Sequence, residues 1–346
     1  GLAAHGVKVD FLVQTRSGPF LDRLPESVRV VELGREPEQI LQALAHFLQQ
    51  ERPAWLISAK LKDDQLAATA RRLAKASTRL IFRVGNPLAH RLRSKSRNPL
   101  HRWLMARRLR RLYAQADAYI AVSQGIADDL TQDLRVPAEK IWVLPNPTVT
   151  SELFEAAQRH PGHPWLAVGQ PPVILAVGGL RQQKDFPTLV RAFARLRRDR
   201  ECRLIILGDG RQGTSLLKLA ARLGVAEDVD LPGWVENPFA YMARAAVFVL
   251  SSRWEGICNV LIEAAALGTP VVATDCISGP REILQGGRFG RLTPVGDARA
   301  MAAAIEAVLA DPPAAEHTRQ AALPFHAQNS LRAYLDALDL HPAHNV

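Results

Sequence analysis

Residues 247–264 read VFVLSSRWEGICNVLIEA and predict one complete strand–loop–helix unit. The apolar run from Val247 to Leu250 is typical of a buried parallel strand. A polar loop follows, and a helical pattern begins at Val260. In parallel sheets, ligands bind in the loops at the carboxyl ends of the strands. The polar residues of this loop are therefore the first candidates for a functional site.

Apolar strands and helical patterns alternate along all 346 residues, which predicts an α/β fold with helices on both faces of parallel sheets. The length allows two doubly wound, Rossmann-like domains that face each other across a cleft. We expect one over residues 1–150 and one over residues 151–325, with a C-terminal helix around 326–346 packing back on the first. The expected strands are Val7–Val13, Val28–Glu32, Trp55–Ser58, Leu80–Val84, Ala118–Val122, Ile141–Leu144, Val173–Val177, Arg203–Leu207, Val229–Leu231, Val247–Leu250 and Pro270–Ala273.

The first residues, Gly1 to Gly6, read as the end of a helix, and an apolar strand starts at once at Val7. A doubly wound domain normally begins with a strand near the middle of its sheet. We therefore expect that this first strand, its glycine-rich loop and the start of the following helix precede Gly1.

Charge is unevenly placed in this chain of net charge +10, because no Asp or Glu occurs between Gln65 and Ala116. Such a bias indicates an anionic partner, such as lipid head groups, an acidic saccharide or nucleic acid. Arg91 to Pro99 is basic and leads into a helical pattern over Leu100 to Tyr113, in which arginines alternate with apolar residues. This segment, 91–113, suits docking on an anionic membrane, although a solvated basic helix packed on its own domain explains it equally well.

The cysteines indicate the compartment. Cys202, Cys258 and Cys276 show no CxxC spacing, so we expect a reducing compartment and neither disulfides nor structural zinc. No apolar run approaches the roughly 20 residues that span a bilayer. We expect a cytoplasmic protein, peripheral on the inner face of the cell membrane.

Two glycine-containing loops follow strands of the second half. In the first, Gly178 and Gly179 let the backbone approach a ligand, and Arg181 and Lys184 supply positive charge before a helix begins. This combination suits a diphosphate, whereas a tight turn with solvated cations is the alternative. In the second loop, Gly208 and Gly210 suit a position beneath a nucleotide, and an ordinary turn explains them equally well.

Glu255 and Glu263 stand eight positions apart, the first in the loop and the second in the helix. A carboxylate accepts hydrogen bonds from two hydroxyls at once, so Glu263 suits the diol of a ribose, and Glu255 suits the sugar beyond a diphosphate. The alternative is a capping glutamate followed by one on the helix face. The intervening amides form a helix N-terminus that can hold anionic or sugar oxygens; they belong to Gly256, Ile257, Cys258, Asn259 and Val260.

The combined pattern resembles family 4 glycosyltransferases over nearly the whole chain. Glu255-Gly256-x-x-Asn259-Val260-x-x-Glu263-Ala264, Gly268-Thr269-Pro270 and Ser278-Gly279-Pro280-Arg281-Glu282 resemble the family's E-x7-E region. Gln183-Lys184-Asp185-Phe186-Pro187 resembles its diphosphate-binding loop. Three further segments stand where the family pattern places them: Gly208-Asp209-Gly210, Gly233-Trp234-Val235 and Ala121-Val122-Ser123.

The resemblance implies a GT-B fold and a role for each matched residue. Lys184 would contact the donor diphosphate, Glu263 the ribose and Glu255 the transferred sugar. The turn at Trp234 and Val235 would meet the base. The family is mostly retaining and uses no catalytic metal, so the phosphate charge would be offset by Lys184, Arg181 and helix dipoles. We therefore expect Glu255, Lys184 and Arg181 to be the catalytic residues.

Two positions depart from the family pattern. Gly179 stands where the family usually has an arginine, and Arg181 is the expected substitute. Gly85 stands where the family often has a histidine that faces the transferred sugar. His90 is near but in a different register, and we interpret it as a surface histidine.

The expected activity is the transfer of a hexosyl or N-acetylhexosaminyl group. The donor would be a nucleotide-diphosphate sugar, UDP-linked, and the acceptor a saccharide or lipid-linked saccharide of the cell envelope; no cofactor and no metal are expected. Two alternatives stay open. A GT-B sugar-nucleotide epimerase would need acid and base groups that the first half does not clearly offer. A non-enzymatic protein that binds nucleic acid or membrane is favoured by charge alone, and the basic stretch lacks interleaved aromatic residues.

Overall fold

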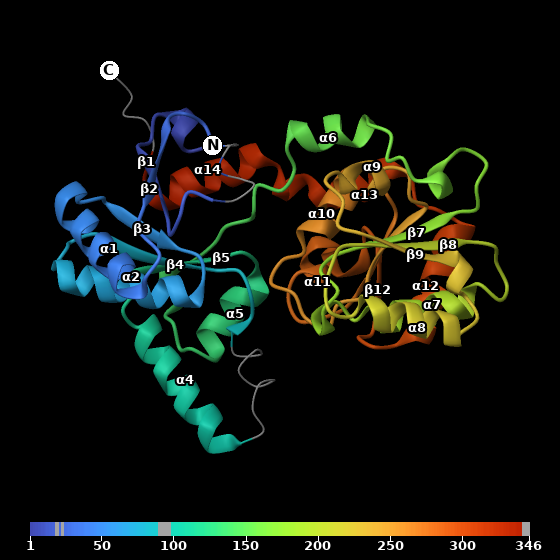
Figure 1. The fold of residues 1–346 in the computed structure, drawn as a ribbon, viewed down its shortest axis with the longest axis horizontal. Coiled ribbons are helices and arrows are strands. Elements are labelled where there is room, and N and C mark those ends of the chain that lie inside the picture. Colours follow the sequence, from blue (N-terminus) through green and yellow to red (C-terminus); the bar gives the residue numbers. More distant parts are fainter. Residues whose placement is uncertain (18–20, 22–23, 89–97, 341–346) are drawn as a thin grey trace. The chain divides into compact units, whose positions relative to one another are not determined.

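A computed structural model describes residues 1–17, 21, 24–88 and 98–340 of the chain. The chain divides into two compact units (Figure 1); unit 1 is coloured from blue to green except for its C-terminal helix, which is red, and unit 2 runs from green to red. Unit 1 comprises Gly1–Leu144 and Gln328–Val346, and unit 2 comprises Pro145–Ala327. The first unit thus ends before Pro145, whereas the sequence placed its end at residue 150. Residues 341–346 of the expected C-terminal helix lie outside the described residues.

Unit 2 contains a parallel sheet of six strands in the order β12-β11-β10-β7-β8-β9. The strand order reverses between β7 and β10, which are neighbours in the sheet but not in the chain. Ligands of doubly wound proteins bind at such a switch point. The strands are β7 (Val173–Val177), β8 (Arg203–Leu207), β9 (Val229–Gly233), β10 (Val247–Leu250), β11 (Val271–Thr274) and β12 (Arg291–Thr293).

Helices cover both faces of this sheet (Figure 1). Ile174 and Ile206 pack on one face beneath α7 (Phe186–Leu196), α8 (Gly213–Arg222) and α12 (Ala298–Ala310). Leu175 and Ile205, their neighbours along the strands, pack on the other face with α9, α10 and α11 because successive strand residues point to opposite sides. The remaining helices of unit 2 are α6 (Ser151–Gln158), α9 (Pro238–Met242), α10 (Asn259–Ala266), α11 (Pro280–Ile283) and α13 (Ala315–Arg319).

Unit 1 has a parallel sheet of four strands, β3 (Trp55–Ser58), β4 (Arg79–Val84), β5 (Ala118–Ala121) and β6 (Ile141–Val143). The helix α14 (Ala327–Leu338) packs on it, since Leu338 joins Ile81 and Ile120 in one buried cluster. The other helices of this unit are α1 (Pro37–Glu51), α2 (Leu61–Ala74), α4 (Pro99–Tyr113) and α5 (Gln124–Gln132). Among the described residues, no helix combines the length and the apolar character needed to cross a membrane.

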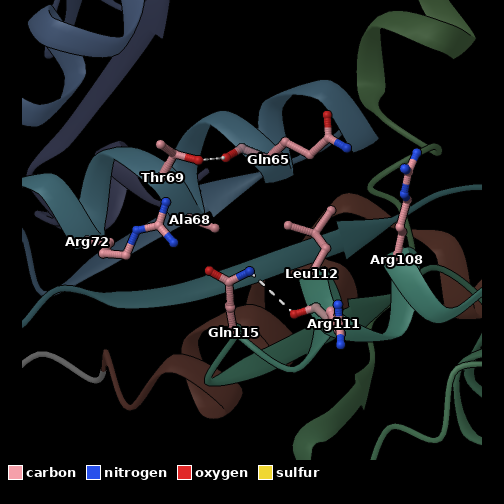
Figure 2. A pocket seen from close by; sticks show the side chains of 8 residues that line it. All are labelled: Gln65, Ala68, Thr69, Arg72, Arg108, Arg111, Leu112 and Gln115. Atoms are coloured by element: carbon pink, nitrogen blue, oxygen red, sulfur yellow. Dashed lines mark hydrogen bonds between the residues drawn. The ribbon is translucent and has the colours of Figure 1, made fainter.

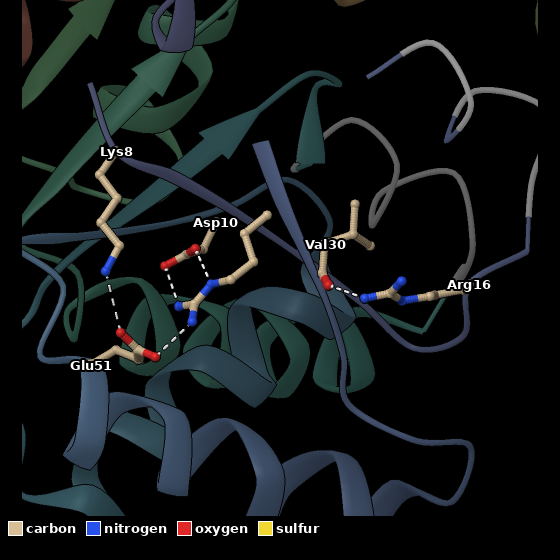
Figure 3. A network of polar contacts seen from close by, with 6 residues as sticks. Lys8, Asp10, Arg16, Val30 and Glu51 are labelled. Atoms are coloured by element: carbon tan, nitrogen blue, oxygen red, sulfur yellow. Dashed lines mark hydrogen bonds and ion pairs between the residues drawn. The ribbon is translucent and has the colours of Figure 1, made fainter. Parts of the chain in front are cut away.

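The strands β1 (Val9–Val13) and β2 (Val28–Glu32) form a parallel pair of their own. Within the described part of the chain, no ladder joins this pair to β3. Instead, exposed ion pairs surround it (Figure 3): Arg29 donates to both carboxylate oxygens of Asp10, at 2.6 and 2.9 Å, and to Glu51 at 2.8 Å. The expectation of a strand upstream of Gly1 stays a prediction.

Candidate active site

Two loops meet at the switch point of unit 2. Lys184 stands in the loop after β7, and Glu255 stands in the loop after β10, the strand beside it. The Lys184 Nζ atom lies 2.7 Å from Glu255 Oε1, and both side chains are largely buried. The structure therefore joins as an ion pair two residues that the sequence had assigned to different parts of the donor.

Further contacts fix the Glu255 carboxylate. The hydroxyl of Ser252 donates to Oε1 at 2.6 Å, and the amide of Gln183 donates to Oε2 at 3.4 Å. Its backbone N–H donates to the carbonyl of Ile277 at 3.3 Å. Ser252 was not predicted as a site residue, and Gln183 was named only as part of the diphosphate-loop pattern. In the sequence, only position could have pointed to them: Ser252 follows β10, and Gln183 precedes Lys184.

Lys184 stays charged in this environment. Burial alone would lower the pKa of Lys184, but Cys258 and Glu255 outweigh burial and raise that pKa above its ordinary value. Burial also raises the pKa of Cys258 to about 12, so its thiol is neutral at neutral pH. The carboxylate of Glu255 is therefore the charge that holds Lys184 as an ammonium ion.

The backbones of the two loops are also joined. The Arg253 N–H donates to the carbonyl of Gln183 at 2.8 Å, and the Ser251 hydroxyl donates to that of Lys184 at 2.6 Å. Arg253 also pairs at 3.2 Å with the buried carboxylate of Asp185. Asp185 occupies the N-cap position of α7, but its side chain caps no backbone amide there. The Lys184–Glu255 ion pair is thus carried by two loops that are joined by hydrogen bonds and a second ion pair.

The glycines bring three loops together. A Cβ atom on Gly208 would lie 2.3 Å from the carbonyl oxygen of Gly178, and one on Gly210 would lie 2.5 Å from that of Leu180. Hydrogen bonds run from the Gly178 N–H to Leu207 and from the Gly208 N–H to Gly233. The loops after β7, β8 and β9 therefore stack on one another, and only glycine fits at 208 and 210. The expectation that these glycines bind a nucleotide stays a prediction.

Arg181 and Gly179 lie together in the β7 loop. The Arg181 Nε atom would be 3.3 Å from a Cβ atom on Gly179, and the Arg181 side chain is exposed. Among the described residues, none forms an ion pair with this guanidinium. Arg181 thus offers a positive charge beside the position where the family pattern has an arginine.

Glu263 stands in α10 and differs from Glu255 in having no partner. Within the described residues, its carboxylate accepts no hydrogen bond, and burial raises the pKa of Glu263 to about 7. A partly buried carboxylate without a donor is free to accept hydrogen bonds from a ligand, and pKa shifts of this kind cluster at functional sites.

The helix α10 begins at Asn259, and the amides of Leu261 and Ile262 donate to the carbonyl of Cys258 at 3.1 and 3.3 Å. The amides of Asn259 and Val260 come before these bonds, so they are the ones that the helix itself leaves open. The Asn259 side chain is itself held, because its Oδ1 accepts from Asn146 at 2.9 Å and from Thr148 at 3.4 Å. Cys258 is buried, and Ile257 and Val260 pack against the core. Cys258, Ile257 and Val260 can therefore offer a ligand only backbone groups, whereas the exposed Asn259 can also offer its side-chain amide N–H groups. The role predicted for them stays a prediction.

Trp234 follows β9 and exposes 70% of its surface, whereas Val235 packs against the core. The indole is available to stack on a planar ligand. In unit 1, Gly85 follows β4, and among the described residues a Cβ atom there would come within 4 Å of Arg83 alone, at 3.8 Å. His90 lies outside the described residues. Across the described ranges, no group of three or more His, Cys, Asp or Glu residues is placed to hold a metal ion.

Known protein families match both halves of the chain. The model described as "Glycosyltransferase Family 4" matches residues 1–152, and the model described as "Glycosyl transferases group 1" matches residues 171–311. A 4-alpha-N-acetylgalactosaminyltransferase of Campylobacter jejuni, named for an N-acetylgalactosamine-N,N'-diacetylbacillosaminyl-diphospho-undecaprenol acceptor, is 35% identical over 200 residues. That alignment covers 58% of this chain and 53% of the relative.

The lipopolysaccharide core biosynthesis glycosyltransferase LpsE of Rhizobium meliloti is 35% identical over 199 residues, which are 58% of this chain and 56% of the relative. The chain thus spans about half the length of these curated relatives. The crystal structure of Anabaena HepE in complex with UDP and glucose superposes with a TM-score of 0.76 at 20% identity, covering 98% of this chain and 94% of HepE.

The structural likeness and the two Rossmann-like units define the GT-B fold. The chain belongs to the family 4 glycosyltransferases, as the resemblance in the sequence predicted. The matches give no support to an epimerase or to a nucleic-acid-binding protein.

Proposed function

We propose that the chain is a retaining glycosyltransferase that takes a sugar from a UDP-linked donor and passes it to a saccharide or lipid-linked saccharide. The observation that carries the proposal is the meeting of Lys184 and Glu255 at the switch point of unit 2. The UDP bound to HepE supports the donor class, and the name of the Campylobacter relative supports a lipid-linked acceptor. We propose the inner face of the cell membrane as its place of action.

Each part of the donor has a matching group. Arg181 and the first amides of α10 suit the diphosphate, because a helix N-terminus carries partial positive charge. Glu263 suits the ribose hydroxyls because its carboxylate has no partner among the described residues. Trp234 suits the base because its ring is exposed.

The chemistry follows from the ion pair. An ammonium group has three donors, so Lys184 keeps two for phosphate oxygens while it holds Glu255. In the transfer, the bond between the anomeric carbon and the diphosphate oxygen breaks, and the acceptor hydroxyl forms the new bond on the same face. The departing diphosphate takes the hydroxyl proton. Lys184 and Arg181 stabilise the charge that develops on the diphosphate.

Two glutamate variants test the division of roles. Glu263→Ala lowers UDP affinity about 30- to 150-fold, the equivalent of ~2–3 kcal/mol for a charge-assisted hydrogen-bonding group, as read by calorimetry. Glu227→Ala is the control, because Glu227 is exposed and precedes the amino end of β9, away from the carboxyl ends. Unchanged affinity of Glu263→Ala would contradict the ribose role.

Glu255→Gln separates binding from chemistry. UDP affinity stays nearly unchanged, because the diphosphate itself supplies a counter-charge to Lys184 when residue 255 is neutral. Transfer from the UDP-sugar falls, because Glu255 acts on the sugar. An equal loss of UDP binding and of turnover would show that this assignment is wrong. A thermal-shift screen with UDP-, GDP- and ADP-sugars identifies the donor used in these assays.

We also propose that transfer needs no metal, since Arg181, Lys184 and the α10 amides supply the positive charge that a metal would otherwise bring. Activity then persists in EDTA. Loss of activity on chelation, with recovery on adding Mn²⁺, would overturn the metal-free mechanism.

A further inference from the structure

A hollow of about 250 Å³ lies between α2 and α4 of unit 1 (Figure 2). None of the described residues that line it carries a carboxylate. Figure 2 shows side chains from both helices turned toward the same space. Its lining consists of three arginines with amide, hydroxyl and apolar groups: Arg72, Arg108, Arg111, Gln65, Gln115, Thr69, Ala68 and Leu112.

The three arginines of this hollow differ from those around them. Arg71 pairs with Asp117, and Arg110 donates to the carbonyl of Asp133 at 3.0 Å. Arg72, Arg108 and Arg111 form no ion pair or hydrogen bond from their guanidinium groups with any described residue. Three like charges around one hollow repel one another, and an anion with several oxygens would offset that repulsion, because guanidinium groups match phosphate geometry.

The exposed face of α4 changes character along the helix. Its first turns present Leu100, Trp103 and Leu104, which are 64%, 55% and 42% exposed. Its later turns present Arg108 and Arg111, two of the three arginines of the hollow, on the same side, since residues at i, i+4, i+7 and i+11 share one helix face. The Arg107 guanidinium lies 5.5 Å from the ring centre of Trp103. Exposed Trp and Leu next to Arg are typical of helices that lie in a membrane interface.

We propose that this hollow binds the phosphate head group of an anionic membrane lipid, while Leu100, Trp103 and Leu104 enter the bilayer interface. At 1.5 Å per residue, Leu104 and Arg111 lie about 10 Å apart along α4, comparable with the ~5–10 Å depth that interfacial helices reach. A soluble phosphate would leave the three apolar side chains in water, which is why the lipid is the occupant. The site uses no residue of the donor machinery in unit 2.

Flotation of the full chain with vesicles tests the charge requirement. The chain binds vesicles of phosphatidylcholine that contain phosphatidylglycerol, and it does not bind phosphatidylcholine alone. The variant R72A/R108A/R111A loses on the order of 100-fold in partitioning, since each basic residue at an anionic surface contributes about five-fold. The control R191A/R195A/R198A removes three exposed arginines of unit 2 and keeps the binding. Equal losses in the two variants would overturn the site in favour of general charge attraction.

Trp103 reports insertion directly. Lipids brominated in their acyl chains quench the fluorescence of the wild type more than that of Trp103→Phe. The pair L100A/W103A weakens vesicle binding, whereas L217A/L223A, which changes two exposed leucines of unit 2, does not. Equal quenching of the wild type and Trp103→Phe would overturn the insertion of α4. Circular dichroism verifies that each variant is folded, as exposed positions should allow.

Two further ligands separate the lipid from other anions. Calorimetry with inorganic phosphate gives binding too weak to saturate. One result would overturn the proposal in favour of a soluble anion: the three arginines are needed for tight binding of phosphate but not for binding of vesicles. The proposal would also be overturned if the chain did not bind the vesicles but retained single-stranded RNA through the three arginines. The failure of UDP binding would refute the proposed transferase function and leave this proposal standing.

Discussion

Two parallel strand pairs, β1–β2 in unit 1 and β7–β8 in unit 2, have ladders of the same length but differ in burial. Each pair joins five residues in register. Nearly all residues of β7 and β8 are buried, whereas no residue of β1 or β2 is, and Phe11 is 45% exposed. Parallel sheets normally have both faces covered. Burial, and not strand pairing, therefore distinguishes the rigid scaffold that carries the candidate active site.

The largest effect that tests this comparison is a core substitution in each pair. Ile205→Ala in β8 costs about 2–5 kcal/mol, because Ile205 is fully buried and leaves a cavity. Phe11→Ala in β1 costs less than about 1 kcal/mol, because a half-exposed ring gives up little contact. Denaturant titration with hydrogen exchange and mass spectrometry reads each unit separately. Equal losses in the free energy of unfolding for the two variants would contradict the idea that burial distinguishes the two strand pairs.

A second test compares one buried carboxylate from each unit. In unit 2, burial raises the pKa of Glu263 to about 7, against roughly 4.3 in the unfolded chain. Between these values the folded state binds more protons, so the free energy of unfolding falls as the pH rises. Glu263→Gln removes this penalty and stabilises unit 2 by up to about 3 kcal/mol at pH 8, with a smaller gain at pH 5. Thermal melts across the pH range measure the stability difference between Glu263→Gln and the wild type. A difference that does not change with pH would contradict the link between the raised pKa of Glu263 and stability.

The carboxylate in unit 1 should respond with the opposite sign. Burial raises the pKa of Asp64 to about 6, but Ser58 donates to it at 2.6 Å and Tyr113 at 3.3 Å. Asp64→Asn disturbs both hydrogen bonds and costs about 1–3 kcal/mol at pH 8. If Asp64→Asn stabilised the chain as Glu263→Gln does, the contrast between a partnered and an unpartnered carboxylate would be wrong.

The smallest effect concerns the ion pairs of β1–β2. Arg29→Ala leaves the denaturation midpoint of unit 1 nearly unchanged despite its contacts with Asp10 and Glu51, because exposed pairs gain little over hydration. High salt further reduces the difference in denaturation midpoint between Arg29→Ala and the wild type. A large loss of stability in Arg29→Ala that persists at high salt would mean that these ion pairs stabilise β1–β2 as strongly as burial stabilises β7–β8.

Apolar patterning, more than burial, decided which strands the sequence predicted. β7, β8 and β10 have the predicted bounds, because strands covered on both faces read as continuous apolar runs. β2 and β3 also have the predicted bounds, although no residue of β2 is buried. β12, Arg291–Thr293, was missed because it is short, polar and at the sheet edge. The unit boundary was misplaced because the Val149 N–H bonds to the carbonyl of Phe325, a long-range contact that attaches the linker to unit 2.

The candidate site shows the same division between local and long-range information. Residue types and spacing predicted Lys184, Glu255 and Glu263 as candidates. Their partners depend on which strands become neighbours, so the contact between Lys184 and Glu255 was not foreseen. The stacking of Gly208 on Gly178 was missed for the same reason, because a glycine pattern does not say which backbone will approach it.

The switch point also sets the order in which the site can assemble on a growing chain. Lys184 and Glu255 are 71 positions apart, and β8 and β9 are synthesised between them. β7 can pair with β8 early, but its other neighbour, β10, emerges later. Until then the ammonium group of Lys184 lacks its counter-charge, and one edge of β7 stays open to other strands. A chain released before Val247 is synthesised therefore has β7, β8 and β9 but no β10, so one edge of β7 stays open to aggregation and Lys184 lacks Glu255.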